Sequence, residues 1–337
     1  MKRILVIGTG GTIACRRTSD GLMPMISSDE ILACVPHCSE FCTMKSRQIM
    51  NIDSTNMQPS DWLRIARVIE EQYENYDGFV ITHGTDTLAY TAAALSYLIC
   101  RSPKPIVVTG AQRPINLEDT DARVNLSDSL LFASSDLAHD VSIVFDGKVI
   151  AGTRAKKERS KSYDAFSSIN FPCIAVIRDQ RILFYLNDKE EAPNVPVFSG
   201  NLDTKVGLLK LIPSMDASIL RYMGENYDAV IIESFGVGGL PSCQNNDFRN
   251  AVAALTDHGK TVVMATQVTN EGSNMSLYEV GRRIKRDYGL LETCDMTLEA
   301  AVTKLMWILG QTRRPDEIRR LFYQTVNHDI IAAPDVT

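Results

Sequence analysis

The stretch that decides the fold is KRILVIGTGGTIA, residues 2–14. Its first half, KRILVI at 2–7, is a short run rich in bulky apolar residues, and this pattern predicts a buried β-strand. Three glycines follow almost at once, and then comes the hydroxyl of Thr12. In an open parallel sheet, ligands bind beyond the carboxyl ends of the strands, so this loop is a candidate part of a site. The alternative is a glycine-rich turn with no ligand.

The loop does not match a nucleotide-binding motif. A dinucleotide fingerprint needs a third glycine where Ile13 stands, and the chain holds no GxxxxGK[ST] phosphate loop. The chain also lacks the GxSxG, HExxH and protein-kinase motifs. A hydrolase built on this sequence would therefore have to use a threonine as its nucleophile.

Outward from this stretch, short β-branched runs alternate with longer helical patterns. Strands are predicted at 2–7, 78–82, 105–109 and 141–145, and helices at 60–76, 85–100 and 122–134. Because strands and helices alternate, we expect an α/β fold whose N-terminal domain has a mostly parallel sheet flanked by helices.

The composition changes at residues 188–204, DKEEAPNVPVFSGNLDT, which are rich in Pro, Asn, Asp and Gly. We interpret them as a linker between an N-terminal domain, 1–187, and a smaller C-terminal α/β domain, 205–337. In the second domain, strands are predicted at 206–211, 229–233 and 261–265, and helices at 246–256, 275–285 and 298–309.

Composition and charge exclude several classes of protein. The 337 residues are 45% hydrophobic and carry a net charge of −6, and such a mildly acidic chain lacks the electrostatic footprint of a nucleic-acid binder. No apolar run approaches the ~20 residues that span a bilayer, and the glycines after the first strand do not fit a signal peptide. We therefore expect a cytoplasmic protein with no membrane or nucleic-acid partner.

The eight cysteines are scattered, which is typical of free thiols in a reducing compartment. At helical spacing, Cys34, Cys38 and Cys42 would share one face and, with His37 beside them, could hold a metal. The alternative is a buried apolar stripe interrupted by Pro36. Without a CxxC pair or a second ligand cluster, we predict no metal.

A second candidate loop, THGTDT at 82–87, also follows a predicted strand. Thr85 or Asp86 could cap the following helix, or that helix N-terminus could offer N–H groups to an anion or an oxyanion. His83 is either a base or a structural residue.

Two further polar segments stand out. NIDSTNM at 51–57 is a loop by default. Near 153–161, the basic residues Lys156, Lys157, Arg159 and Lys161 are expected to be solvated, although one lysine could act as a base if desolvation lowered its pKa.

Taken in order, these segments resemble the bacterial L-asparaginase family, most closely its cytoplasmic type I members. The resemblance covers essentially the whole chain. It rests on GGTIA at 10–14, NIDSTNM at 51–57, HGTDT at 83–87, VTGAQRPI at 108–115 and EAAVTKLMWILG at 299–310.

The resemblance implies a reaction and a set of catalytic residues. The chain would hydrolyse L-asparagine to L-aspartate and ammonia, with Thr12 as the nucleophile and a β-aspartyl-enzyme intermediate. Thr85, Asp86 and a lysine would form the second catalytic group. The family places that lysine thirteen residues before an Asn, and counting back from Asn170 reaches Lys157, with Lys161 as the alternative.

The resemblance also implies how the substrate is held. Asp53, Ser54 and Asp86 would bind its α-carboxylate and amine, and Ala111 would contribute a backbone contact near the leaving amide. The full substrate-binding set is Gly11, Asp53, Ser54, Thr55, Gly84, Thr85, Asp86 and Ala111. Oxyanion donors would come from the Gly10–Gly11 backbone and the helix N-terminus at Thr85. No metal or cofactor is expected, and the chain would form a homodimer or homotetramer with sites completed across the dimer interface.

Two positions depart from the family pattern. Leu22 stands where a lid tyrosine is common, and Gly239 stands where an asparagine from the partner subunit often contacts substrate. Both departures bear on affinity and on the preference for Asn over Gln.

Two rival functions are an amidotransferase subunit that deamidates Gln on charged tRNA and a non-catalytic amino-acid-binding protein. The amidotransferase subunit carries an extra N-terminal domain, whereas this chain starts at its first strand. A binding protein has no need of the nucleophile Thr12.

Overall fold

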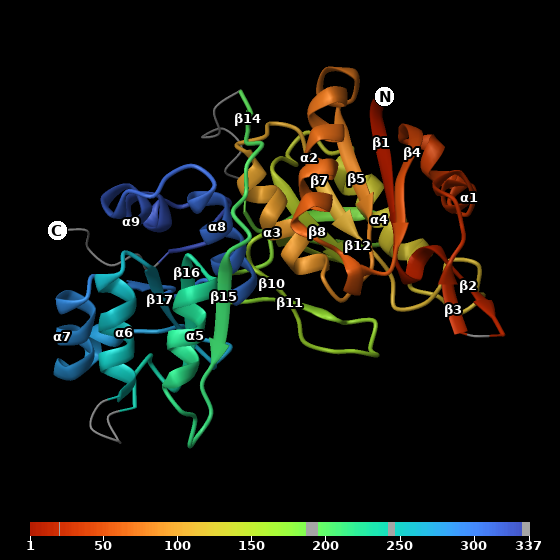
Figure 1. Cartoon of the computed structure of the whole chain (residues 1–337). Coiled ribbons are helices and arrows are strands. Elements are labelled where there is room, and N and C mark those ends of the chain that lie inside the picture. The colour runs from red at the N-terminus through yellow and green to blue at the C-terminus, as the bar shows by residue number, and fades with distance from the viewer. Residues whose placement is uncertain (20, 187–194, 242–246, 332–337) are drawn as a thin grey trace. The chain divides into compact units, whose positions relative to one another are not determined.

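The structure is a computed structural model, and it describes residues 1–19, 21–186, 195–241 and 247–331. The chain divides into two compact units, Met1–Gly200 and Asn201–Thr337. Figure 1 shows helices and a sheet in each of them, so the predicted α/β fold is confirmed. The predicted linker, 188–204, lies partly outside the described residues, and the domain limits stay a prediction.

An eight-stranded sheet forms the centre of the first unit. Its strands, in spatial order, are β13 (Arg181–Phe184), β12 (Ala175–Arg178), β9 (Lys148–Ala151), β8 (Val141–Phe145), β7 (Ile106–Thr109), β5 (Gly78–Thr82), β1 (Lys2–Gly10) and β4 (Cys42–Ile52). The pairs from β8 to β4 are parallel, and those from β8 to β13 are antiparallel. The mostly parallel sheet predicted from the alternation is confirmed.

Strand β1 lies between β4 and β5 and runs beyond the predicted residues 2–7, to Gly10. Its pairing with β4 shifts between Gly8 and Gly10, and Gly10 stands opposite Ile52. The φ of Gly10 is +103°, and a Cβ on it would lie 2.5 Å from backbone atoms of Ile52. Glycine is needed here both for the positive φ and for the close approach of the two strands.

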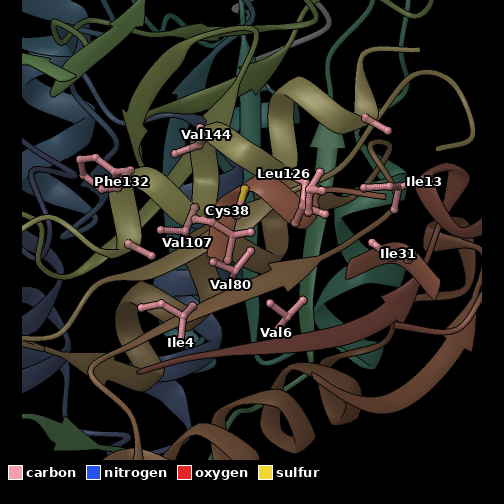
Figure 2. Packing of buried hydrophobic residues seen from close by; sticks show 14 of the residues in the cluster. Ile4, Val6, Ile13, Ile31, Cys38, Val80, Val107, Leu126, Phe132 and Val144 are labelled. Carbon is pink, nitrogen blue, oxygen red and sulfur yellow. The ribbon is translucent and has the colours of Figure 1, made fainter. Parts of the chain in front are cut away.

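Helices flank this sheet. Those of the first unit are α1 (Ser28–Ala33), α2 (Pro59–Gln72), α3 (Leu88–Leu98) and α4 (Ala122–Ala133), with the short 3₁₀ helices η1 (Thr12–Ala14), η2 (Pro36–Glu40), η3 (Ser54–Asn56) and η4 (Tyr73–Asn75). Helix α4 contacts β5, β7 and β8, and α2 packs against α3. Figure 2 shows the core beside α4, in which Val6, Val80 and Val107 come from neighbouring strands and Leu126 comes from α4. Loops at the sheet edge are thereby anchored to a packed core.

Three two-stranded ribbons complete the first unit. They are β2 (Cys15–Thr18) with β3 (Gly21–Pro24), β10 (Ala155–Lys157) with β11 (Phe166–Ser168), and β6 (Ile99–Cys100) with β14 (Val197–Phe198). All three are antiparallel. Strand β14 falls within the stretch predicted as a linker.

The second unit holds a four-stranded parallel sheet. Its strands, in spatial order, are β15 (Val206–Lys210), β16 (Ala229–Ser234), β17 (Thr261–Thr266) and β18 (Leu291–Glu292). Its helices are α5 (Ser218–Asn226), α6 (Asp247–Asp257), η7 (Met275–Leu277), α7 (Glu279–Asp287), α8 (Leu298–Leu309) and α9 (Pro315–Tyr323). The smaller C-terminal α/β domain predicted from the sequence is confirmed as a fold.

The cysteine-rich segment is not one helix, because the chain turns at Pro36. Cys34 caps α1, Cys38 lies in η2 and Cys42 opens β4. Burial raises the pKa of the Cys42 thiol to about 12, so this thiol stays protonated. The cysteines in the described residues are free thiols, and those residues contain no His/Cys/Asp/Glu group placed to hold a metal. Cys243 lies outside them.

Among the helices that the structure describes, none combines the length and the apolar character needed to cross a bilayer.

Candidate active site

Four of the candidate loops emerge at one edge of the large sheet. Thr82 at the end of β5 stands opposite Gly8 of β1 and Thr109 of β7, and Gly10 stands opposite Ile52 of β4. Because these four strands are parallel, their carboxyl ends meet at the same edge. The segments that follow them, 11–12, 53–55, 84–86 and 111–112, therefore lie side by side.

Three of these loops touch through residues with little or no side chain. The Gly11 N–H donates to the Ile52 carbonyl at 2.9 Å. A Cβ on Gly11 would lie 2.2 Å from the backbone nitrogen of Gly84, and a Cβ on Gly84 would lie 2.5 Å from Ser54 Oγ. We call this meeting of Gly11, Gly84 and Ser54 the glycine contact. It brings the loop of Thr12 directly against the segment that carries Thr85.

Thr12 opens η1 and is half-buried. The loop after β7 is tied to it, because the Ile115 N–H donates to the Ile13 carbonyl at 3.2 Å. Cys15 is the thiol nearest along the chain, and burial raises its pKa to about 11, with the negative charge of Asp53 adding to the effect. Cys15 therefore stays a thiol and is no competing nucleophile.

Lys157 reaches the same edge from the β10–β11 ribbon, where it pairs with Phe166. Its ammonium group donates to Thr85 Oγ1 at 2.7 Å and to Asp86 Oδ1 at 2.5 Å. The Lys157 side chain is 17% exposed and that of Asp86 is 57% exposed. Lys157 is thus largely buried, contrary to the solvated surface expected for this basic run, whereas Lys161 is exposed.

The helix after the second loop begins later than predicted. It starts at Leu88, and its N-cap Thr87 makes no side-chain capping bond, so Thr85 and Asp86 are not its caps. The expected oxyanion donors are also wrong in part, because the helix N-terminus is not at Thr85 and the Gly11 N–H is engaged by the Ile52 carbonyl. The Thr87 hydroxyl instead donates to the Ser54 carbonyl at 2.8 Å, a further link between two loops.

Asp53 shapes its own loop. Its carboxylate accepts from the Thr55 N–H and the Thr55 hydroxyl, both at 2.9 Å, and it caps η3. Ser54 is buried between the loops, whereas Asp53 and Thr55 are exposed. Ala111, two residues beyond the end of β7, is fully buried.

His83 is buried, and both of its ring nitrogens are engaged. Nδ1 pairs with the Gly84 carbonyl at 2.7 Å and Nε2 with Thr91 Oγ1 at 2.9 Å, while Trp62 Nε1 donates to the same hydroxyl. Because a carbonyl can only accept, Nδ1 carries the proton and Nε2 accepts. Burial lowers the pKa of His83 to about 4, so the ring is neutral at physiological pH and serves a structural purpose.

Sequence reasoning missed Gln112, whose position in VTGAQRPI was the available signal. Its side-chain oxygen accepts from Thr85 Oγ1 at 3.4 Å, and its amide nitrogen donates to the Ser162 carbonyl at 3.0 Å. Asp121 fixes the backbone beneath it by accepting the N–H groups of Gln112 and Arg113. Burial raises the pKa of the Asp121 carboxyl, and these hydrogen bonds oppose that rise.

The two residues that depart from the family pattern lie in different units. Leu22, in β3, pairs with Arg17 and is 52% exposed. Gly239, in the second unit, forms an isolated bridge with Phe235 beyond the end of β16.

The fold and the site define an α/β enzyme with hydroxyl, amine and carboxylate groups at the carboxyl edge of a parallel sheet. Residues 3–190 match the family described as "Asparaginase, N-terminal", and residues 205–322 match "Glutaminase/Asparaginase C-terminal domain". The chain therefore belongs to the asparaginase/glutaminase family of amidohydrolases, which confirms the resemblance in the motifs.

Comparison with individual proteins also places the chain among asparaginases and their relatives. The L-asparaginase of Thermococcus kodakarensis is 39% identical over 97% of this chain and 99% of its own length, and its solved structure has a TM-score of 0.91 at 38% identity, covering 98% and 99%. Escherichia coli L-asparaginase 1 is 33% identical over 98% of each chain. A glutamyl-tRNA(Gln) amidotransferase subunit from Pyrococcus horikoshii is also 33% identical, over 94% of this chain and 74% of its own.

A more distant solved structure is described as a probable cytoplasmic L-asparaginase from Campylobacter jejuni. It has a TM-score of 0.82 at 26% identity and covers 96% of this chain and 100% of its own.

Proposed function

We propose that this chain is an L-asparaginase, which hydrolyses L-asparagine to L-aspartate and ammonia with no metal or cofactor. One observation carries the proposal. The Lys157 ammonium contacts the Thr85 hydroxyl and the Asp86 carboxylate at the sheet edge where Thr12 also lies. The names of the relatives from T. kodakarensis and E. coli support the choice of substrate.

The proposed reaction begins with attack of Thr12 Oγ1 on the side-chain amide carbon of asparagine. A threonine hydroxyl is a weak nucleophile and needs a nearby base, which Lys157 in its neutral form supplies through Thr85. The carbon–nitrogen bond breaks, ammonia leaves with the transferred proton, and a β-aspartyl ester remains on Thr12. Water then attacks the ester and releases aspartate.

The other loops at the carboxyl edge of the large sheet bind the substrate in this proposal. Asp53, Ser54 and Asp86 hold the α-ammonium and α-carboxylate groups, and the exposure of Asp53 and Asp86 leaves their carboxylates accessible to a small zwitterion. Gly11, Thr55, Gly84 and the backbone of Ala111 complete the set. With Leu22 and Gly239 in place of the usual polar side chains, we expect substrate affinity to depend on this set more than on the lid.

The first test is an ammonia-release assay with Asn, with Gln and without substrate. We expect release from Asn, and loss of at least ~10³-fold in kcat for Thr12→Ala because the nucleophile is gone. Thr43→Ala, at an exposed position on β4, is the matched control and should keep full activity. Unchanged release by Thr12→Ala would sink the assignment of the nucleophile.

The second test decides between the two lysines. Lys157→Met removes the group that contacts Thr85 and Asp86, so we expect turnover to be abolished, whereas Lys161→Met changes an exposed side chain and should leave turnover intact. The same ammonia assay measures both, with circular dichroism as the check on folding. The reverse outcome would reassign the base to Lys161.

A second candidate function has specific support, because some relatives are named as a glutamyl-tRNA(Gln) amidotransferase subunit. That function predicts ammonia release from Gln only with a partner and charged tRNA, and little release from free Asn. A non-catalytic binding protein predicts no release from either amino acid. The assay above therefore separates the asparaginase from the other two. Repeating it with Gln in the presence of the partner and charged tRNA separates the amidotransferase subunit from the binding protein.

Assembly and location follow from the same proposal. We infer a homodimer or homotetramer in which a partner subunit completes each site, and a cytoplasmic location like that in the name of the C. jejuni protein. Sedimentation of the purified chain would test the assembly, and a monomer with full activity would contradict the shared site.

A further inference from the structure

The side chain of Gln112 bridges Thr85 and the segment that follows Lys157. Its Nε2 donates to the carbonyls of Ser162 at 3.0 Å and Arg159 at 3.4 Å. Its Oε1 accepts from Thr85 Oγ1 at 3.4 Å. Gln112 is held from behind by Asp121, which accepts its backbone N–H at 2.8 Å.

Hydrogen-bond chemistry decides which end of the amide faces Thr85. The two carbonyls can only accept, so the NH₂ group of Gln112 must point at them. The oxygen of the same amide therefore faces the Thr85 hydroxyl. This orientation follows from the hydrogen-bond partners alone.

The hydroxyl of Thr85 has one proton to give. An ammonium group on Lys157 can only donate, so it occupies a lone pair of Thr85 Oγ1, and the Thr85 proton must go to another acceptor. Gln112 Oε1 is that acceptor. When Lys157 is neutral, the same proton can turn to its Nζ instead.

We propose that Gln112 is a positioning residue that sets the direction of the Thr85 O–H bond and thereby favours the protonated state of Lys157. The proposal rests on the function proposed above. In the attack step, the O–H bond of Thr12 breaks and one forms on Thr85, while the former Thr85 O–H bond breaks and an N–H bond forms on Lys157. The newly formed Thr85 hydroxyl then needs an acceptor other than Lys157, and Gln112 Oε1 supplies it.

Several charged side chains surround this chain of hydrogen bonds. Asp86 is the carboxylate in contact with Lys157, and Asp121 lies behind Gln112. Of the other charged side chains on these loops, Arg113 pairs with Asp119, Arg159 with Asp164, and Glu158 with the hydroxyl of Ser167. Lys161 and Asp53 are exposed and Lys156 is partly exposed, so solvent screens their charges. A change of charge at position 112 should therefore act mainly on Lys157.

The test compares Gln112→Met with Gln112→Glu. Both variants lose the NH₂ group and its bonds to Ser162 and Arg159, so that loss is common to the pair. They differ in what faces Thr85, a group that accepts poorly in one and a carboxylate in the other. Gln72→Met, on α2, is a control for loss of a glutamine elsewhere.

We expect the acidic limb of the pH profile of kcat/KM for asparagine to move in opposite directions in the two variants. It should move to lower pH in Gln112→Met and to higher pH in Gln112→Glu, by about half to one pH unit each. In both variants kcat should fall about tenfold, with KM within about twofold of its original value. Gln72→Met should leave the profile unchanged.

Two outcomes would overturn the proposal. One is movement of the acidic limb in the same direction in both variants. The other is a fall in kcat with no movement of the limb. Each is what we expect from a residue with a merely structural role. The ¹³Cε signal of Lys157, assigned by its absence in Lys157→Met, provides a readout that needs no turnover. If the titration midpoint of this signal moves in opposite directions in the two variants, the role of Gln112 is supported even in a chain that releases no ammonia. The absence of ammonia release would then count against the proposed function alone.

Discussion

At the scale of single residues, Gly11 makes a contact that a residue with a side chain could not make. Its φ of +77° is uncommon for other residues, and the space where a Cβ would stand is filled by the backbone of Gly84. Gly259 has a similar φ of +71° but nothing within 4 Å of its Cβ position. Gly259 therefore has room for a Cβ, whereas Gly11 has none.

We predict that Gly11→Ala costs more stability than Gly259→Ala. Both variants bear the strain of positive φ, about 1–3 kcal/mol. Gly11→Ala bears more, because a ψ of −179° puts Gly11 in a region that is essentially restricted to glycine, and it must also push two loops apart. Urea unfolding of each variant and the ammonia assay measure the two effects, and Gly11→Ala should also lose most of its activity. An equal loss of stability would show that the glycine contact contributes nothing to the free energy of unfolding.

His83 gives a prediction about pH. Its pKa is lowered to about 4 in the folded chain by burial, so between pH 6.5 and 4 the unfolded chain takes up a proton that the folded chain refuses. Stability is therefore full above pH 6.5 and is lost as pH falls toward 4. From pH 7 to pH 5 the loss from this one residue is about 2 kcal/mol.

His83→Asn removes that titration. The free energy of unfolding of the variant should fall less between pH 7 and pH 5 than that of the unaltered chain, although the variant is less stable at pH 7. His258→Gln, an exposed histidine after α6, is the control and should follow the unaltered chain. The prediction is wrong if the free energy of unfolding of His83→Asn falls as much between pH 7 and pH 5 as that of the unaltered chain.

At the scale of elements, a buried ion pair ties α8 to the segment after α9. Lys304 Nζ lies 2.7 Å from Asp329 Oδ2, and both side chains are fully buried. Lys304 also donates to the Gln324 carbonyl at 2.7 Å, and Asp329 accepts the Val326 N–H at 2.9 Å. The pair thus organises the turn that follows α9.

We predict that Lys304→Met destabilises the second unit by about 3–5 kcal/mol, because it removes the ammonium group that contacts the buried Asp329 carboxylate. Arg320→Met, which breaks an exposed pair with Glu317 on α9, should cost at most about 0.5 kcal/mol. Thermal unfolding and hydrogen exchange of the α8 amides measure both. Similar costs for the two variants would contradict the prediction.

Elements were predictable from the sequence where a continuous apolar run has clear ends. The predictions for 78–82, 141–145 and 298–309 match β5, β8 and α8 residue for residue. Strand β4 was not predicted, because it is a sheet edge whose exposed Lys and Arg side chains break the apolar pattern. The ribbons β2–β3 and β10–β11 were missed because three- and four-residue strands carry too little periodicity.

The candidate site was predictable in its loops and not in its contacts. The register of β1, β4, β5 and β7 brings four separate motifs to one edge, as the rule for parallel sheets implies. The start of α3 at Leu88 was missed, because a Thr-Asp-Thr run offers several capping residues. The contact of Lys157 with Thr85 depends on long-range packing of a short ribbon, which residue spacing does not encode.

At the scale of the whole molecule, each of the two units has its own apolar core. Leu126 and Val107 belong to a core of the first unit, and Leu220 and Val252 to that of the second. Length and composition indicated two domains, and the change in composition near 188–204 indicated roughly where to divide them. Pairing of β14 with β6 attaches Val197 and Phe198 to the first unit, a long-range contact that a Pro- and Asn-rich stretch does not reveal.

The order of the site along the chain has a consequence for its synthesis. The loops proposed to hold asparagine are complete once residue 111 has left the ribosome, whereas Lys157 follows much later and pairs with Phe166 of β11. A chain that ends before β11 carries the residues of the first unit proposed to contact asparagine, but Lys157 lacks the strand that pairs with it. On the proposed assignment, hydrolysis requires the complete β10–β11 ribbon, so the catalytic lysine is placed later in synthesis than the loops proposed to bind the substrate.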